Sequence, residues 1–203
     1  MTTRIQIRQS VFETTSSSSH SLTLGENILN FPLPRVVPGG TYVILFGDYG
    51  WEDGLLDNWE EKLQYLMTDA MLCYTHEMAE PLLDIVKQPP STEQFRKLTD
   101  YILSGNPMFH SERPENQGLM DFRNKLVPEK VACIIDILKG YLGYDEVLIS
   151  YEQVCENSYR YNAFGDIDHE SVGTTSEVWD MDVHGIAGFL FGDSFIELGN
   201  DND

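Results

Sequence analysis

Basic residues are scarce in this chain of 203 residues. There are 13 Lys and Arg against 33 Asp and Glu, and the formal net charge is −20. Such a chain repels phosphates, so the shortage of cations argues against direct binding to a nucleic-acid backbone. A basic partner or divalent cations would be attracted instead. The imbalance is greatest in residues 145–203, where fourteen acidic residues face one basic residue, Arg160.

Cysteine pairs and long apolar runs are also missing. The three cysteines are widely spaced and form no CxxC pair, which predicts neither a disulfide framework nor a cysteine zinc site. No apolar run approaches the roughly 18 residues of a membrane helix, and the opening MTTRIQIRQS lacks the apolar core of a signal peptide. We therefore expect a cytoplasmic protein that makes no membrane contact. Its 41% of hydrophobic residues suffices for the core of a single globular domain.

The predicted elements change in kind along the chain. Apolar alternation or β-branched clustering predicts strands at residues 3–9, 41–46 and 147–151. Amphipathic spacing predicts helices at about 58–75, 81–87, 91–105 and 128–143. The segment IAGFLFGDSFIEL, residues 186–198, is typical of a hairpin with its turn near Gly192. This order predicts an α+β fold: a small mixed or antiparallel sheet from the N- and C-terminal strands, with a helical insertion at about 57–143.

Local signals mark where some of these helices begin. Asp57 with Glu60, and Ser91 with Gln94, have the spacing of a capping box. Pro128 suits the first turn of the last helix, because its missing N–H would have no partner there.

The most unusual stretch is TTSSSSHSLTL, residues 14–24. Hydroxyls combined with free backbone amides can hold phosphate without glycine, and His20 could act as an acid or base near neutral pH. Neither GxxxxGK[ST] nor GxGxxG is present. An exposed serine-rich turn is the alternative interpretation. The predicted ligand-binding residues here are Arg4, Arg8, Ser16, Ser17, Ser18, Ser19 and Ser21.

A second candidate combines GDIDHES, residues 165–171, with WDMDVHG, residues 179–185. On an extended strand, Asp180, Asp182 and His184 would share one face. Carboxylate and imidazole ligands together suit a divalent metal as cofactor. Exposed polar loops in an acidic region are the alternative. The predicted metal ligands are Asp166, Asp168, Asp180, Asp182 and His184.

The opening RQSVFETTSSSSHSLTL, the late Asp168-His169-Glu170-Ser171 and the tail with Asn200-Asp201-Asn202 together carry a family resemblance. The chain resembles uncharacterised proteins encoded by tailed bacteriophages, which begin with Val-Phe-Glu-Thr, a serine run and His-Ser. Thr15 stands where that family would have Asn. The resemblance covers residues 8–24 and 166–203 and implies a phage origin, without implying a particular chemistry.

If these two ends are the shared parts, residues 16–20 and 168–171 would face one another across a sheet. His20 and His169 would then do acid–base work, and Ser171 would join the ligand-binding hydroxyls. The first predicted function is binding of a phosphate-bearing small molecule or nucleotide, with or without a reaction on that ligand. The alternative is an acidic, non-enzymatic mimic of nucleic acid that inhibits a basic host nuclease or other defence protein. A virion or scaffold accessory protein is the third, with the Ser-His motif only stabilising the fold.

Overall fold

The chain forms two compact units whose segments are interleaved along the sequence. The structure, a computed structural model, describes residues 6–7, 18–26, 28–50, 53–72, 78–111, 113–154, 163–167, 171 and 173–200. Unit 1 contains Met1–Val36, Gly47–Asp69 and Asp166–Asp203, and unit 2 contains Val37–Phe46 and Ala70–Gly165. The predicted helical region at about 57–143 therefore contributes to both units.

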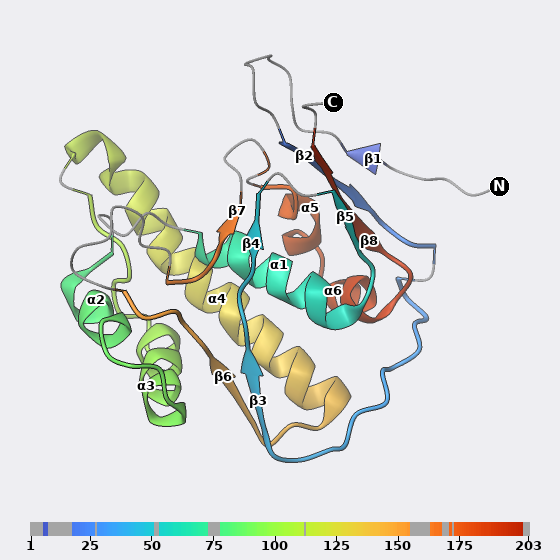
Figure 1. Cartoon of the computed structure of the whole chain (residues 1–203), viewed down its shortest axis with the longest axis horizontal. Coiled ribbons are helices and arrows are strands. Elements are labelled where there is room, and N and C mark those ends of the chain that lie inside the picture. Colours follow the sequence, from blue (N-terminus) through green and yellow to red (C-terminus); the bar gives the residue numbers. More distant parts are fainter. Residues whose placement is uncertain are drawn as a thin grey trace. The chain divides into compact units, whose positions relative to one another are not determined.

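Unit 1 is built on a sheet that joins the two ends of the chain. Its strand order is β1-β2-β8-β5, with every neighbouring pair antiparallel. In Figure 1 the blue β2 lies beside the red β8, and their register pairs His20 with Leu198 and Leu22 with Ile196. The strands are β1 (Gln6–Ile7), β2 (Ser18–Thr23), β5 (Gly54–Leu56) and β8 (Phe195–Asn200). A separate parallel pair consists of β4 (Asp48–Tyr49) and β7 (Asp166–Ile167).

Three helices complete unit 1: α1 (Trp59–Met71, its last two residues assigned to unit 2), α5 (Ser176–Trp179) and α6 (Val183–Phe191). The start of α1 is capped by Asn58, whose Oδ1 accepts the Glu61 N–H at 2.9 Å. The cap is therefore one residue later than the predicted Asp57.

The hairpin predicted at residues 186–198 is wrong in its first half, which belongs to the helix α6. Every residue from Gly185 to Phe191 is buried. A fully apolar run shows neither the period of a helix nor that of a strand, so its composition does not distinguish the two. The helix is started by Asp182, whose side chain accepts the Gly185 N–H at 2.8 Å. Only the second half of the predicted hairpin is a strand, β8.

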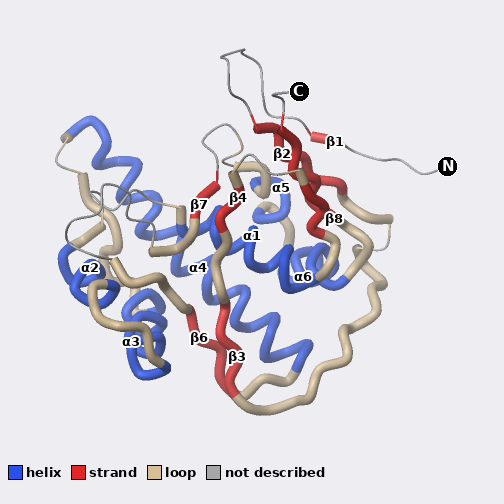
Figure 2. The backbone as a smooth tube through the Cα atoms, viewed as in Figure 1, coloured by secondary structure: helices blue, strands red, loops and turns tan. Residues whose placement is uncertain are grey.

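Unit 2 combines a two-stranded parallel sheet with helices. The strands β3 (Thr41–Ile44) and β6 (Glu146–Ile149) pair in parallel. The apolar runs at 41–46 and 147–151 predict the two strands but not their pairing. The helices are α2 (Glu80–Val86), α3 (Thr92–Leu103) and α4 (Gln117–Leu142), with a short 3-10 turn η2 (Pro114–Asn116) before α4. Figure 2 shows these helices in blue and the two strands in red. The predicted cap of α3 is confirmed, since Ser91 Oγ accepts the Gln94 N–H at 3.2 Å.

The helix α4 begins eleven residues before the predicted start at Pro128. Pro128 lies inside the helix, where it removes one backbone hydrogen bond. Met120 and Val127, both upstream, belong to the same buried stripe as Val131 and Ile134. The exposed Leu119 and Phe122 interrupt the apolar pattern in this part and hide the helical period.

The α+β class, with a small sheet from the terminal strands, is therefore confirmed. Among the residues that the structure describes, no helix combines the length and the apolar composition needed to cross a bilayer.

Candidate functional site

The described part of the serine stretch is a strand and not a loop. Ser18–Thr23 forms β2, which pairs with β8 along its whole length. Side chains alternate across a strand, so His20 and Leu22 point to the same face as their partners Leu198 and Ile196. All four of these side chains are buried, and His20 is only 5% exposed. The pleat thus places an imidazole in the core of unit 1.

Both ring nitrogens of His20 contact oxygen atoms within unit 1. Nδ1 lies 2.8 Å from the Tyr65 hydroxyl, and Nε2 lies 3.3 Å from the Gly50 carbonyl oxygen. A carbonyl only accepts, so Nε2 carries the hydrogen in this contact, and in the neutral ring the Tyr65 hydroxyl donates to Nδ1. The two rings also meet edge to face, with centroids 5.7 Å apart. These contacts fix both the orientation and the tautomer of His20.

The structure brings His20 together with Ser171, as the resemblance between the two ends implies. The His20 backbone N–H donates to Ser171 Oγ at 3.2 Å, and Ser171 is itself buried. The Thr174 hydroxyl then donates to the Ser171 carbonyl at 2.6 Å. Residues 20 and 171 therefore belong to one buried hydrogen-bonded group.

Asp69, near the end of α1, anchors the same C-terminal loop. Its carboxylate accepts the Gly173 N–H at 3.0 Å and, through a very short contact, the Thr175 hydroxyl. Charge-assisted hydrogen bonds of this kind are stronger than those between neutral groups. Asp69 and Tyr65 thus hold Gly173, Thr174 and Thr175 against the helix, a role that neither the spacing nor the composition of the sequence reveals.

Two buried tyrosines complete the group. The rings of Tyr49 and Tyr65 lie 4.8 Å apart. Burial raises the pKa of Tyr65 far above its usual range, with a smaller contribution from Asp69, although a hydrogen bond to Thr174 acts in the opposite direction. Burial, followed by Glu61 and Asp48, likewise raises the pKa of Tyr49. Both phenols therefore stay protonated near neutral pH, and neither can serve as a general base there.

The predicted anion cradle needs a correction for its described part. Ser18, Ser19 and Ser21 lie within a paired strand, so their backbone amides are not presented together as in a loop. Of the remaining predicted residues, Arg4, Arg8, Ser16 and Ser17 lie outside the described residues, as do Asp168 and His169. Their roles stay predictions.

The common strand face predicted for Asp180, Asp182 and His184 is wrong, because these residues lie at the junction of two helices. Asp180 ends α5, Asp182 caps α6, and His184 is on α6 with its Nε2 3.2 Å from the Leu29 carbonyl oxygen. Asp166 is exposed on β7. Within the described ranges, no three His, Cys, Asp or Glu side chains are arranged to hold a metal ion.

Sequence reasoning also missed Lys62, which is fully buried on α1. Its Nζ donates to the carbonyl oxygens of Gly192 at 3.0 Å and Ser194 at 2.9 Å, and lies 5.6 Å from the centre of the Phe189 ring. The ammonium therefore joins α1 to the end of α6 and the approach to β8. Its position three residues after Trp59, on the apolar side of the predicted helix, is the one sequence signal for its burial.

Burial lowers the pKa of Lys62 to about 8, although Asp57 and Asp193 act in the opposite direction. A lysine with a lowered pKa is a potential nucleophile or base. Here the side chain has no exposed surface, and its hydrogens are directed at two carbonyls. The contacts of Lys62 are those of an internal cross-link.

Comparison with protein-family models, with curated proteins and with solved structures finds no match to this chain. The resemblance to tailed-phage proteins therefore remains a prediction.

Proposed function

We propose that this chain is a non-enzymatic binding protein whose unit 1 presents a negatively charged surface to a basic protein. The partner that this chemistry fits is one with a cationic groove for nucleic acid, because closely spaced carboxylates reproduce the charge of a phosphate backbone. This is the second of the three functions that the sequence leaves open.

The observation that carries the proposal is the distribution of charge in unit 1. Of its thirteen described carboxylate side chains, ten are exposed. Its described basic side chains are Arg35, which is exposed, and Lys62, which is buried and bonded to carbonyls. The exposed carboxylates are those of Glu26, Asp48, Asp53, Asp57, Glu60, Asp166, Asp180, Asp182, Asp193 and Glu197.

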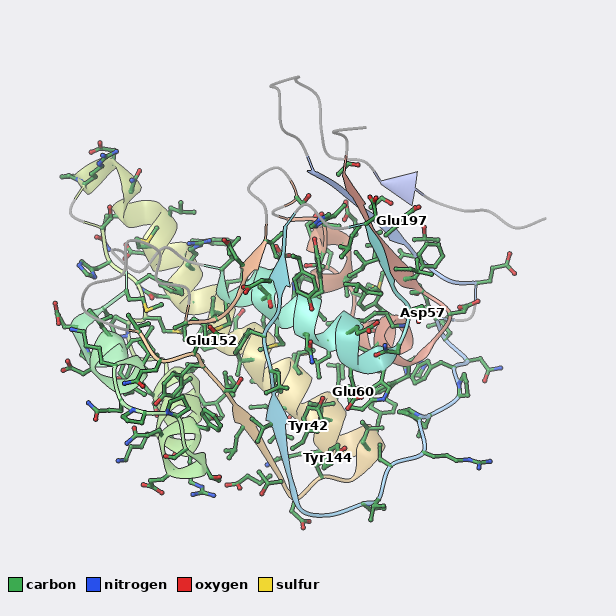
Figure 3. The ribbon with its side chains drawn as sticks, viewed as in Figure 1. Tyr42, Asp57, Glu60, Tyr144, Glu152 and Glu197 are labelled. Atoms are coloured by element: carbon green, nitrogen blue, oxygen red, sulfur yellow. The ribbon has the colours of Figure 1, made fainter. Side chains whose placement is uncertain are left out.

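Three of these carboxylates come from different elements of unit 1 and are labelled in Figure 3. Asp57 follows β5, Glu60 is in the first turn of α1, and Glu197 is on β8. Glu197 is paired across the sheet with Leu55, and both side chains are exposed on the face opposite His20. Exposed carboxylates with few cations among them attract a cationic surface at long range and speed the encounter of the two proteins.

The same features give less support to the phosphate-ligand prediction. An anionic ligand would be repelled by the exposed carboxylates of unit 1, and the ring of His20 is engaged by Tyr65 and Gly50. That prediction now depends on the serines and arginines outside the described residues.

A capture experiment tests the proposal. The immobilised chain is incubated with bacterial lysate at about 0.05 M salt and at about 1 M salt, where the Debye length falls to roughly 3 Å. We expect a basic protein to be retained at low salt and released at high salt. The captured protein should bind DNA on its own, and the chain should compete with that DNA.

Two matched triple variants locate the interaction. Asp57→Asn/Glu60→Gln/Glu197→Gln removes three exposed charges from unit 1 and should abolish capture. Asp84→Asn/Asp100→Asn/Glu129→Gln removes three exposed charges from unit 2 and should leave it unchanged. Equal loss in both variants, or no captured protein at either salt, would contradict the proposal.

A further inference from the structure

The first half of α4 carries large apolar side chains on its solvent face. Leu119 is 54% exposed and Phe122 is 60% exposed, although both belong to a helix whose other face is buried. Gly118, one residue before Leu119, is also exposed, and a Cβ built there would meet no atom within 4 Å. Residues three and four apart share a face of a helix, so Gly118 and Phe122 lie side by side.

Charged residues of opposite sign flank this apolar surface. Glu115 lies before it and Lys125 after it, and both are exposed. Among the described residues, neither takes part in an ion pair. The surroundings are nearly neutral, since residues 113–130 contain four basic and three acidic residues in a chain of net charge −20.

Glu115, Gly118, Phe122 and Lys125 form a surface that is complementary to a second, antiparallel copy of itself. Positions 115 and 125 are equally distant from residue 120, and so are positions 118 and 122. Glu115 is in the 3-10 turn η2, which leads directly into α4. When two copies of η2 and the start of α4 are placed antiparallel with residue 120 at the centre, Glu115 of each copy faces Lys125 of the other. In the same register, Phe122 of each copy faces Gly118 of the other, where the missing side chain leaves room for the ring.

We propose that the solvent face of η2 and the first half of α4 is a self-association surface. It pairs with the same surface of a second copy about a two-fold axis that crosses the helix at the level of residue 120, on the side opposite the buried Met120. Such an axis forms every contact twice, as in most homodimers. The ten residue steps from Glu115 to Lys125 span about 15 Å along the helix, which is less than a stable interface requires. The association is therefore weak and is expected between about 10 μM and about 1 mM. This inference does not depend on the proposed function.

Charge exchange tests the antiparallel register directly. Sedimentation velocity is measured from about 10 μM to about 1 mM at about 0.15 M salt, where distant charges are screened. Wild type should form dimers in this range. Glu115→Lys alone would place two lysine pairs at the interface, and Lys125→Glu alone would place two glutamate pairs there, so neither variant should dimerise. An equimolar mixture of the two variants should dimerise again, because both charge pairs are then restored.

Apolar variants provide the second arm of the test. Phe122→Ser should raise the dissociation constant at least about tenfold, as expected for an aromatic residue at the centre of an interface. Leu103→Ser, at an apolar residue of α3 that is 43% exposed, serves as the matched control and should leave dimerisation unchanged. The proposal is overturned if wild type stays monomeric to the highest concentration, if Phe122→Ser dimerises normally, or if mixing the charge variants restores nothing.

Discussion

At the scale of single residues, His20 shows how burial decides what a side chain can do. Imidazole next to serines suggests catalysis or phosphate binding, and the sequence offers no further distinction. In the fold its two ring nitrogens face Tyr65 and Gly50, and its backbone N–H faces Ser171. Each of these contacts joins segments distant in sequence, so they stabilise unit 1.

We therefore expect His20→Ala to destabilise the protein. The substitution leaves a cavity and removes one of the hydrogen-bond partners of the Tyr65 hydroxyl, which together should lower the free energy of unfolding by about 2–4 kcal/mol. Tyr65→Phe should cost about 1–2 kcal/mol, and the double variant should lose less than the sum because the two residues share one hydrogen bond. Urea denaturation measures all three.

His110→Ala is the matched control for this series, because His110 is exposed in unit 2. Its free energy of unfolding should change by no more than about 0.5 kcal/mol. A similarly small change for His20→Ala would mean that the buried contacts of His20 contribute little, and would favour a ligand-binding role instead.

The lowered pKa of Lys62 predicts that the free energy of unfolding depends on pH in the alkaline range in an unusual way. Its pKa in the fold is about 8, below the ordinary lysine value of 10.5. Between these two values the unfolded chain binds more protons at this residue than the folded chain. The Lys62 contribution to the free energy of unfolding therefore rises with pH across this window, by up to roughly 2 kcal/mol between pH 8 and 10.

Other ionisable groups lower the free energy of unfolding as the pH rises, so their effect must be separated from that of Lys62. The raised pKa values of Tyr49, Tyr65 and Cys133 make the folded chain lose stability at alkaline pH. Lys62→Met keeps those groups and removes the lysine. The stability of wild type minus that of Lys62→Met should therefore increase from pH 8 to pH 10 in urea titrations. If this difference does not change with pH, Lys62 has the same pKa in the folded and the unfolded chain.

At the scale of elements, the sequence predicts those whose pattern is local. The strands at 41–46 and 147–151 are short apolar runs, and α3 has both amphipathic spacing and the Ser91 cap. The helix α6 is not predicted in this way, because all its residues from Gly185 to Phe191 are buried and the sequence therefore shows no polar face. The strand predicted for Asp182 and His184 is wrong for the same reason, since the sequence does not reveal the helix that Asp182 caps and that contains His184.

Asp182 should behave as a helix cap. Its side chain accepts the Gly185 N–H at 2.8 Å, and Asn is about as good as Asp at this position. Asp182→Ala should lower the free energy of unfolding by about 1 kcal/mol, whereas Asp182→Asn should stay within about 0.5 kcal/mol of wild type. Thermal unfolding followed by circular dichroism measures both. Equal losses for Ala and Asn would indicate that the negative charge matters more than the cap.

The glycines of α6 allow a neighbouring segment to pack closely. A Cβ on Gly188 would lie 2.6 Å from the Ile28 carbonyl carbon and still nearer its oxygen, and these are backbone atoms that cannot rotate away. Gly188→Ala should therefore cost about 2–3 kcal/mol, because residues 28–31 must shift. Gly140→Ala on the exposed face of α4 meets nothing within 4 Å and should stabilise by about 0.5–1 kcal/mol. Urea midpoints compare the two, and equal effects would contradict the close packing.

At the scale of the whole molecule, the sequence predicts the charge directly. It does not predict how the buried hydrogen-bonded group around His20 and Ser171 is assembled. The prediction that residues 20 and 171 meet depends on the predicted resemblance, which combines motifs from both ends of the chain. The sequence does not predict that Tyr65 and Asp69 join them, because both lie on a helix between the two ends and carry no motif. Such contacts depend on which faces of the helix and sheet meet, and that is decided by tertiary packing.

The excess of carboxylates predicts that salt stabilises this protein. With a net charge of −20, repulsion between like charges opposes the compact state, and added ions screen it. The thermal midpoint should rise between about 0.01 M and about 0.3 M NaCl, and less so for Asp57→Asn/Glu60→Gln/Glu197→Gln. MgCl2 at equal ionic strength should give the same midpoint as NaCl, because screening alone is at work. A larger stabilisation by Mg²⁺ would instead reveal a specific metal site, since binding to the folded state adds to screening. That site would have to use ligands beyond the described residues, with Asp168 and His169 the first to substitute.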